Sequence, residues 1–249
     1  MNTTTNTPVK TALVTGASRG IGRAIAQRLA RDGFFVIINY AGNTATAEET
    51  LADITSAGGH AAIIRADIGD ETEVDRLFTE ALALNGRLDV VVHNAGIMQT
   101  APIRPDSLEL FDRTIRTNLR SAFLMLGHAA EHTAEGGRII AFSTSVIAKS
   151  FPGYGAYIAS KAGVEGLVRV LANELRGRNI TVNAVAPGPT GTELFYHGKT
   201  EAQIQAIAQQ SPLERIGEPE EIAAVVSMLA GADGAWINAQ ILRANGGFA

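Results

Sequence analysis

The chain has 249 residues, of which 46% are hydrophobic and 18% are charged, and its formal net charge is −4. This length and hydrophobic content favour one α/β domain with a large buried sheet. Lysine and arginine form no block, which argues against a nucleic-acid or anionic-membrane surface. The sequence contains no cysteine, so disulfides, thiolate metal sites and a cysteine nucleophile are excluded. The five histidines are interpreted as surface or pocket residues, and no metal site is predicted.

The start of the chain is rich in threonine and asparagine. Residues 1–9 have neither the basic region nor the apolar run of a signal peptide, and we expect a disordered tail there. No apolar stretch approaches the roughly 20 residues that a membrane-spanning helix needs. We therefore expect a soluble, cytoplasmic protein without a membrane partner.

From residue 10 onward, short apolar runs alternate with longer amphipathic stretches. This order is typical of a parallel sheet that helices cover on both faces. Strands are predicted at 10–15, 34–39, 61–66, 88–93, 138–143, 180–185 and 239–242. Helices are predicted at 20–31, 44–57, 71–84, 111–131, 154–176 and 218–229. The expected fold class is therefore α/β, with a doubly wound parallel sheet of about seven strands in a single domain over residues 10–249.

One segment interrupts this alternation. Residues 188–212 combine proline, glycine and threonine with a short helix-like stretch at 201–209. An insertion between a strand and the next long helix often covers a pocket and moves. We predict a substrate lid near 188–212; the alternative is a surface loop without such a role.

A glycine-rich turn joins the first predicted strand to the first predicted helix. It reads Thr-Gly-Ala-Ser-Arg-Gly-Ile-Gly over residues 15–22. Such a turn lets the backbone approach a pyrophosphate that lies at the helix N-terminus. A turn that is merely tight is the alternative, but its place in a strand–turn–helix unit favours a dinucleotide site. The cofactor-binding residues predicted here are Gly16, Ser18, Arg19, Gly20, Ile21 and Gly22.

A second motif lies far downstream, where Tyr157 and Lys161 are separated by about one helical turn. A free tyrosine has a pKa of about 10 and is a poor base unless a nearby cation stabilises the phenolate. A lysine at i+4 on the same helix face supplies that cation. A solvated helix face would have the same spacing, but the glycine turn upstream favours a catalytic pair.

The second predicted strand indicates which nucleotide is preferred. An NAD site needs an acidic residue about 20 residues past the glycine turn, where it binds the ribose 2′-hydroxyl. Asn39 and Tyr40 occupy that place, and the next acidic residue is Glu48. Arg19, within the turn, offers a guanidinium suited to a phosphate. This combination predicts NADP(H) as cofactor; the alternative is an exposed Arg19 with no ligand.

Together and in this order, the motifs over residues 10–249 resemble those of the short-chain dehydrogenase/reductase family, in its NADP-preferring branch. The turn corresponds to the family's Thr-Gly-x-x-x-Gly-x-Gly, and Tyr157 with Lys161 to its Tyr-x-x-x-Lys. His93-Asn94-Ala95-Gly96 matches Asn-Asn-Ala-Gly, with histidine in place of the first asparagine. The resemblance implies a Rossmann-type fold. It also implies cofactor contacts at Asp67, Ile68, Asn94, Ala95, Gly96, Pro187, Gly188, Thr190 and Thr192.

The resemblance further implies a mechanism. The cofactor gives hydride to a carbonyl carbon, and Tyr157 gives a proton to the developing alkoxide. Lys161 would lower the pKa of Tyr157 and hold the nicotinamide ribose, and both Tyr157 and Lys161 are predicted to bind the cofactor as well. Asn118 would help to anchor a water that links Lys161 to solvent. From its residue type alone, Asn118 is equally a helix-interior asparagine bonded to the backbone.

The family also uses a serine hydroxyl to orient the substrate carbonyl, usually thirteen residues before the tyrosine. In this chain that spacing gives Thr144, which is followed by Ser145. Threonine carries the same donor hydroxyl but has a more restricted χ1. We predict Thr144 for this role and keep Ser145 as the second candidate.

The predicted function is NADPH-dependent reduction of a small ketone, aldehyde or quinone-like carbonyl to the alcohol. A β-ketoacyl carrier-protein reductase would share every motif, but an acidic carrier protein needs a basic docking surface, for which only Arg176 and Arg178 are candidates. A non-catalytic NADP(H)-sensing protein is the third possibility, although such proteins typically lose the tyrosine or the lysine. Glu135-Gly-Gly-Arg and Asn39-Tyr40 resemble the polyhydroxynaphthalene-reductase-like branch more closely.

Apolar residues on more than one face of the predicted helices 111–131 and 154–176 indicate a further helical partner. These residues include Phe123, Leu124, Leu126, Val164, Leu167, Val168 and Leu171. The resemblance implies paired long helices across one twofold axis and contacts of residues 236–249 across another, which together give a homotetramer. A thick core within a single chain is the alternative.

Overall fold

The computed structural model describes residues 9–249, so the predicted tail lies outside the described residues except for Val9. Seven strands form one sheet in the order β3-β2-β1-β4-β5-β6-β7. Every neighbouring pair is parallel. The strands are β1 (Thr11–Val14), β2 (Phe35–Tyr40), β3 (His60–Arg65), β4 (Val90–His93), β5 (Arg138–Phe142), β6 (Thr181–Pro187) and β7 (Ile241–Ala244). The predicted fold class is confirmed.

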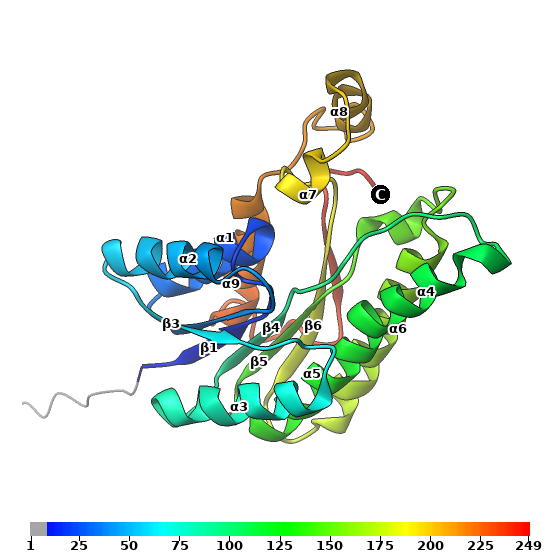
Figure 1. Ribbon diagram of the computed structural model, residues 1–249. Coiled ribbons are helices and arrows are strands. Elements are labelled where there is room, and N and C mark those ends of the chain that lie inside the picture. Colours follow the sequence, from blue (N-terminus) through cyan, green and yellow to red (C-terminus); the bar gives the residue numbers. More distant parts are fainter. Residues whose placement is uncertain (1–8) are drawn as a thin grey trace, which may run out of the picture.

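Helices cover both faces of this sheet (Figure 1). One face carries α1 (Gly20–Arg31), α2 (Thr44–Ser56) and α9 (Pro219–Ala230), and the other carries α3 (Glu71–Asn85), α5 (Ser121–His132) and α6 (Gly155–Glu174). Successive strand residues point to opposite faces, so Leu13 belongs to one apolar core and its neighbours Ala12 and Val14 belong to the other. Both faces of the sheet are therefore buried, and most residues of the central strands are apolar.

The order of the strands reverses beside β1, which pairs with β2 on one side and with β4 on the other. In open parallel sheets of this kind, ligands bind outside the carboxyl ends of the strands at the reversal. The glycine turn follows β1 and His93 ends β4, so both motifs lie at this point.

The prediction of one regular α-helix over 111–131 is wrong, because a π-helical turn interrupts it. The chain instead forms α4 (Leu108–Thr114), a π-helix η2 (Ile115–Arg120) and then α5. Short 3₁₀ segments, η1 (Pro105–Ser107) and η3 (Ser145–Ala148), lie in the connections. A π turn is rare and is frequently found at functional sites. This one contains Asn118, a predicted catalytic residue.

The segment predicted as a lid contains two short helices, α7 (Glu193–Tyr196) and α8 (Glu201–Ala208). Both project beyond the carboxyl edge of the sheet (Figure 1), and the C-terminal segment contacts the end of the predicted lid, where Ser211 donates to the carbonyl of Gly246. Thr200 and Gln203 form a capping box at the start of α8. Within residues 9–249, no helix is long and apolar enough to cross a membrane.

Candidate active site

The turn between β1 and α1 leaves no room for side chains at its glycines. Gly16 and Gly20 have φ of 63° and 54°, a region that favours glycine. A Cβ on Gly22 would lie 2.2 Å from the carbonyl oxygen of Gly16, and a Cβ on Gly16 would lie 3.0 Å from Cα of Ala95. The bare backbone therefore opens onto the N-terminus of α1, which fits a pyrophosphate group.

Side-chain hydrogen bonds hold the turn against the end of β4. Oγ1 of Thr15 accepts from the backbone N–H groups of Asn94 and Ala95, both at 3.1 Å. Nδ2 of Asn94 donates to the carbonyl oxygens of Thr15 at 3.0 Å and Gly16 at 3.3 Å. The predicted residues Gly16, Asn94 and Ala95 thus lie together. Thr15, to which sequence analysis gave no role, joins them.

His93 is a buried, neutral link beneath these residues. Its Nδ1 lies 3.4 Å from Oγ1 of Thr15, and its Nε2 lies 3.5 Å from Oγ of Ser121. Thr15 already accepts two N–H bonds, so its own proton points to Nδ1, whereas the Ser121 hydroxyl donates to the carbonyl of Thr117 at 2.5 Å. This pattern assigns the Nε2–H tautomer. Burial, assisted by the charge of Lys161, lowers the pKa of His93 to about 3.

The π-helix directs the fully buried Asn118 to the loop that follows β4. Its Oδ1 accepts from the N–H of Ile97 at 2.8 Å, and its Nδ2 donates to the carbonyl of Ile97 at 2.9 Å and to Oγ of Ser160 at 3.1 Å. A Cβ on Gly96 would lie 3.0 Å from Oδ1 of Asn118 and 3.4 Å from Nζ of Lys161. Asn118 is therefore a backbone-bonded asparagine that also lies beside the catalytic candidates.

Tyr157 and Lys161 lie near the start of α6. Nζ of the buried Lys161 donates to the carbonyl of Phe142 at 2.8 Å, and burial lowers the pKa of this ammonium to about 8. Burial of the Tyr157 hydroxyl raises its pKa to about 12, against a smaller lowering by a hydrogen bond with Thr144. The lowering of the Tyr157 pKa by Lys161 that the resemblance implies is not seen, and the effect of burial dominates. Tyr157 is protonated at neutral pH.

The two candidate hydroxyls after β5 have different surroundings. Thr144 begins η3 as its N-cap, where Oγ1 accepts from the N–H of Val146 at 3.3 Å, and its hydroxyl reaches Tyr157. Ser145 is fully buried; its Oγ donates to the carbonyl of Ala186 at 2.8 Å and accepts from Nδ2 of Asn245 at 3.0 Å. The structure therefore brings Thr144, and not Ser145, into contact with the candidate acid.

Asn39 and Tyr40, at the end of β2, differ in what their side chains contact. Nδ2 of Asn39 donates to the carbonyl oxygens of Ile64 and Ala66 at 3.3 and 3.1 Å, so this buried amide binds the neighbouring strand segment. These bonds use only the amide nitrogen of Asn39, and its role in cofactor binding stays a prediction. Tyr40 is 7% exposed and its hydroxyl donates to Oγ1 of Thr44 at 3.3 Å. No acidic group occupies this strand end.

Arg19 is the exposed N-cap residue of α1, and no side-chain bond caps the helix there. Across residues 9–249 its guanidinium forms no ion pair, whereas Arg23 of the same helix pairs with Asp53 at 2.6 Å. An arginine at the mouth of the turn supplies a positive charge beside the predicted phosphate positions.

Asp67 and Ile68 follow β3. The exposed Asp67 carboxylate accepts from the N–H of Gly69 at 2.9 Å, and the N–H of Asp67 donates to the carboxylate of Glu73 at 2.7 Å. Ile68 is buried in the core, so its side chain is not exposed at the site. Asp70 is the N-cap of α3, and its carboxylate accepts from the backbone N–H groups of Thr72 and Glu73.

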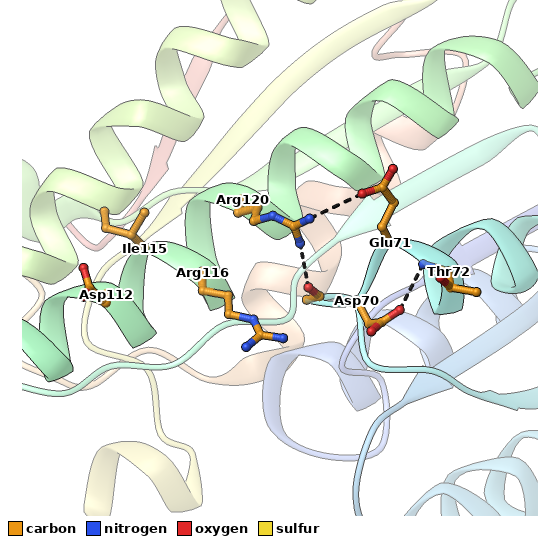
Figure 2. Close-up of a pocket in the computed structure, with 8 residues that line it drawn as sticks. Asp70, Glu71, Thr72, Asp112, Ile115, Arg116 and Arg120 are labelled. Carbon is orange, nitrogen blue, oxygen red and sulfur yellow. Dashed lines mark hydrogen bonds and ion pairs between the residues drawn. The ribbon is translucent and has the colours of Figure 1, made fainter.

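A cavity of about 620 Å³ lies beside this corner, between the start of α3 and η2 (Figure 2). Arg120 forms part of the cavity wall. Its guanidinium donates to the carbonyl of Gly69 at 2.8 Å and pairs with the carboxylate of Glu71 at 3.5 Å. Its lining residues are Gly69, Asp70, Glu71, Thr72, Asp112, Ile115, Arg116 and Arg120. None of the catalytic candidates lines it, so this cavity is lateral to the predicted site.

The segment after β6 brings the remaining predicted residues to the turn. Thr190 is buried and its hydroxyl donates to the carbonyl of Gly188 at 3.0 Å. Thr192 caps α7, and a Cβ on Gly20 would lie 3.3 Å from its Cγ2. Pro187 ends β6 directly before Gly188. The predicted lid is thus anchored against the glycine turn.

Comparison with known proteins agrees with this geometry. A family model described as enoyl-(acyl carrier protein) reductase matches residues 16–249. A short chain dehydrogenase from Burkholderia cenocepacia, solved in complex with NADP, superposes with a TM-score of 0.90 at 36% identity, covering 96% of this chain and 97% of that one. The chain belongs to the short-chain dehydrogenase/reductase family.

Two curated members of the short-chain dehydrogenase/reductase family show the range of its relatives. An Arabidopsis thaliana protein named NADPH-dependent aldehyde reductase-like protein, chloroplastic, is 41% identical over 253 residues, with 96% of this chain and 94% of that protein covered. A tetrahydroxynaphthalene reductase of Pyricularia oryzae is 38% identical over 251 residues, with 96% and 89% covered. The predicted family resemblance is confirmed over nearly the whole chain.

Proposed function

We propose that this protein is an NADPH-dependent carbonyl reductase that converts a small ketone, aldehyde or quinone-like substrate to the alcohol. The observation that carries the proposal is the state of Tyr157. Tyr157 is partly buried at the start of α6, its hydroxyl contacts the Thr144 hydroxyl, its raised pKa keeps it protonated at neutral pH, and it lies one turn before the buried Lys161. The names of the Arabidopsis and Pyricularia relatives support the nucleotide and the carbonyl classes.

The residues present fit a bound dinucleotide. The side-chain-free glycine turn would hold the pyrophosphate, Arg19 would hold the 2′-phosphate, and Pro187 with Gly188 would lie beside the nicotinamide. NADPH, when bound, supplies the hydride that reduces the carbonyl carbon.

The chain's own residues then manage the proton and the charge. Thr144 donates to the carbonyl oxygen and orients it, and Tyr157 transfers its phenolic proton to that oxygen as it becomes an alkoxide. An alkoxide is a stronger base than a phenolate, so this transfer is favourable even for a weakly acidic phenol. The Lys161 ammonium stabilises the phenolate that remains. Ser160, held by Asn118, donates to the carbonyl of Tyr157 at 2.7 Å and fixes this turn of α6.

A carbonyl panel tests this proposal. NADPH consumption should be measured with aliphatic and aromatic aldehydes, cyclic ketones and quinones, together with direct titration of NADPH binding. The proposal predicts turnover with at least one class. Tight NADPH binding without turnover of any substrate would instead favour the non-catalytic, cofactor-sensing alternative.

The surroundings of Arg178 speak against the carrier-protein reductase alternative. This arginine is one of the two candidates for a basic docking surface. Arg178 pairs with Glu135 at 2.8 Å and donates to the carbonyl of Thr133 at 2.7 Å. These bonds lie at the amino-terminal edge of β5 and β6, at the opposite end of the strands from Tyr157. A docking surface at the mouth of the site would therefore lack this charge.

Cofactor preference is expected to follow the charge at the end of β2. We predict that NADPH is used more efficiently than NADH, and that Tyr40→Asp reverses or erases this preference because a carboxylate repels the 2′-phosphate. Tyr40→Asn is the matched control, because asparagine has the shape of aspartate without its charge, and this variant should retain the preference. The measurement is kcat/KM with each cofactor; equal values in the unmodified protein would contradict the assignment.

We further propose that the chain assembles as a homotetramer. Leu126, Val164, Val168 and Leu171, which sequence analysis counted toward an interface, are buried within the chain. Other large apolar side chains on the same helices remain exposed, namely Phe111 (42%), Phe123 (64%) and Val170 (57%). Trp236, in the segment expected at the second interface, is 99% exposed. These side chains supply the apolar surface that two twofold contacts require.

Light scattering at micromolar concentration should give the mass of four chains. Phe123→Glu should reduce this mass by half, because it places a charge in one apolar contact and leaves the contact at Trp236 intact. The mass of a single chain for the unmodified protein would rule the tetramer out.

Residues 188–212 are proposed as the substrate lid, since Leu194 and Tyr196 expose apolar surface beside the site and Thr192 at its base contacts Gly20.

A cytoplasmic location stays a prediction from the sequence, and the Arabidopsis relative is named chloroplastic.

A further inference from the structure

Asn245, the residue directly after β7, is hydrogen-bonded on every side of its amide. Nδ2 donates to Oγ of Ser145 at 3.0 Å and to the carbonyl of Ala249 at 2.8 Å, and Oδ1 accepts from the N–H of Gly247 at 2.9 Å. The N–H can only donate and the carbonyl can only accept, so these partners fix the orientation of the amide. The side chain has a single arrangement that satisfies all three.

Through Ser145 this amide joins the carboxyl ends of three strands. The buried Ser145 hydroxyl donates to the carbonyl of Ala186 in β6 at 2.8 Å, which leaves its lone pair for Asn245. Ser145 itself lies three residues after the end of β5. One hydroxyl and one amide therefore fix β5, β6 and β7 relative to one another beside the site.

The backbone of Asn245 also supports Gly188. A Cβ on Gly188 would lie 2.8 Å from both Cα and Cβ of Asn245, and the N–H of Gly188 donates to the carbonyl of Ala244 at 2.9 Å. Gly188 belongs to the turn proposed to lie beside the nicotinamide. Asn245 thus contacts this turn directly and reaches Thr144 through its neighbour Ser145.

The rest of the C-terminal segment supports the connection from η3 to α6. Phe248 is 3% exposed, its ring lies 6.3 Å from that of Phe151 between centroids, and Nζ of Lys149 lies 4.9 Å from its centroid. Ser211, at the end of the proposed lid, donates to the carbonyl of Gly246 at 2.5 Å. The segment from Asn245 onward therefore touches the loop that leads to Tyr157 and the base of the lid.

We propose that Asn245 is a positioning residue for hydride transfer: its amide, acting through Ser145, fixes the Thr144 hydroxyl relative to the Pro187–Gly188 turn. The inference rests on the proposed function, because it concerns the distance between the carbonyl and the nicotinamide. A displacement of about 1 Å between reacting groups can cost about 100-fold in rate. It also gives Ser145 a role, as the link that holds Thr144 in place.

Asn245→Asp tests the inference, since it keeps the shape and removes the amide donor. We expect kcat to fall about tenfold or more, with the NADPH dissociation constant within about threefold of the unmodified protein. Hydrogen exchange should rise in peptides that cover 143–148 and 186–191. Asn85→Asp is the matched control, because Nδ2 of Asn85 also donates to a carbonyl, that of Val9 at 2.9 Å, and to a hydroxyl, that of Thr11 at 2.7 Å. This control lies at the opposite edge of the sheet and should leave kcat and both peptides unchanged.

A double-mutant cycle separates positioning from general loss of stability. If Asn245 acts through Ser145, Ser145→Ala combined with Asn245→Asp should lower kcat no further than the larger single effect. Additive losses, or an unchanged kcat in Asn245→Asp, would overturn the inference. If the unmodified protein reduces no carbonyl, the proposed function fails instead, and the exchange of the two peptides still decides whether Asn245 fixes them: unchanged exchange overturns the inference.

Discussion

Replacing Tyr157 by phenylalanine is expected to abolish carbonyl reduction while NADPH still binds. The ring keeps its packing at the start of α6, and only the proton donor is removed. Positioned general acids contribute typically about 10²–10⁴-fold, so kcat/KM should fall at least that far. Binding should change little because no contact of the glycine turn involves the phenol.

Tyr154→Phe is the matched control for this prediction. Tyr154 lies close enough to raise the pKa of Tyr157 slightly, but it is not positioned as the proton donor. Its replacement should leave most of the activity. Retention of more than a few per cent of activity by Tyr157→Phe, measured as initial rates with the best panel substrate, would show that the assigned mechanism is wrong.

Thr144→Val should be the next most damaging change, and Ser145→Ala a much milder one. Valine keeps the β-branched shape but lacks the hydroxyl that contacts Tyr157, so both the orientation of the carbonyl and the hydrogen bond to the acid are lost. A loss of about 10²–10⁴-fold in kcat/KM is expected for such a group. Ser145 acts one step further away, through Ala186 and Asn245.

Thr144→Ser tests whether the hydroxyl itself is responsible, since serine restores the donor without the methyl group. This variant should recover most of the activity lost in Thr144→Val. If Ser145→Ala proves the more damaging change, the two hydroxyls exchange roles. Two mild results would leave the orientation of the carbonyl to groups outside residues 143–145.

The elements of the fold could be predicted because their signals are local. Glycines at fixed positions mark the turn, and apolar runs mark the strands, so all seven strands lie within two residues of their predicted ends. β7 begins two residues later than predicted, at Ile241, because Ala239 has a left-handed backbone with φ of 59° that does not continue a strand.

What the sequence did not reveal depends on contacts between distant segments. The π turn at Asn118 has no signature of its own in the hydrophobic pattern, since the apolar residues continue with helical spacing across it. The pairing of Ser145 with Asn245 joins positions 100 residues apart. The position of Asn39 near the end of a strand could be predicted. The bonds of its amide nitrogen to the carbonyls of Ile64 and Ala66 could not, because they depend on the neighbouring strand.

Two histidines on one helix show that spacing alone does not decide between a metal site and a packing contact. His128 and His132 lie four residues apart on α5, a spacing that also occurs in helical metal sites. Their rings instead pack on Phe78 of α3, with centroid distances of 5.2 and 5.6 Å. No group of three or more potential metal ligands occurs within the described residues. The pair therefore belongs to the contact between α3 and α5.

Transfer of deuterium from labelled NADPH tests the central claim most directly. The protein should be incubated with the best carbonyl substrate and NADPH deuterated at the transferable position of the nicotinamide, and the alcohol analysed by mass spectrometry. One deuterium is expected at the carbinol carbon of each product molecule in the unmodified protein, and at least about 10²-fold less labelled product in the same time with Tyr157→Phe. Tight binding of NADPH without deuterium transfer to any carbonyl class would contradict the central claim.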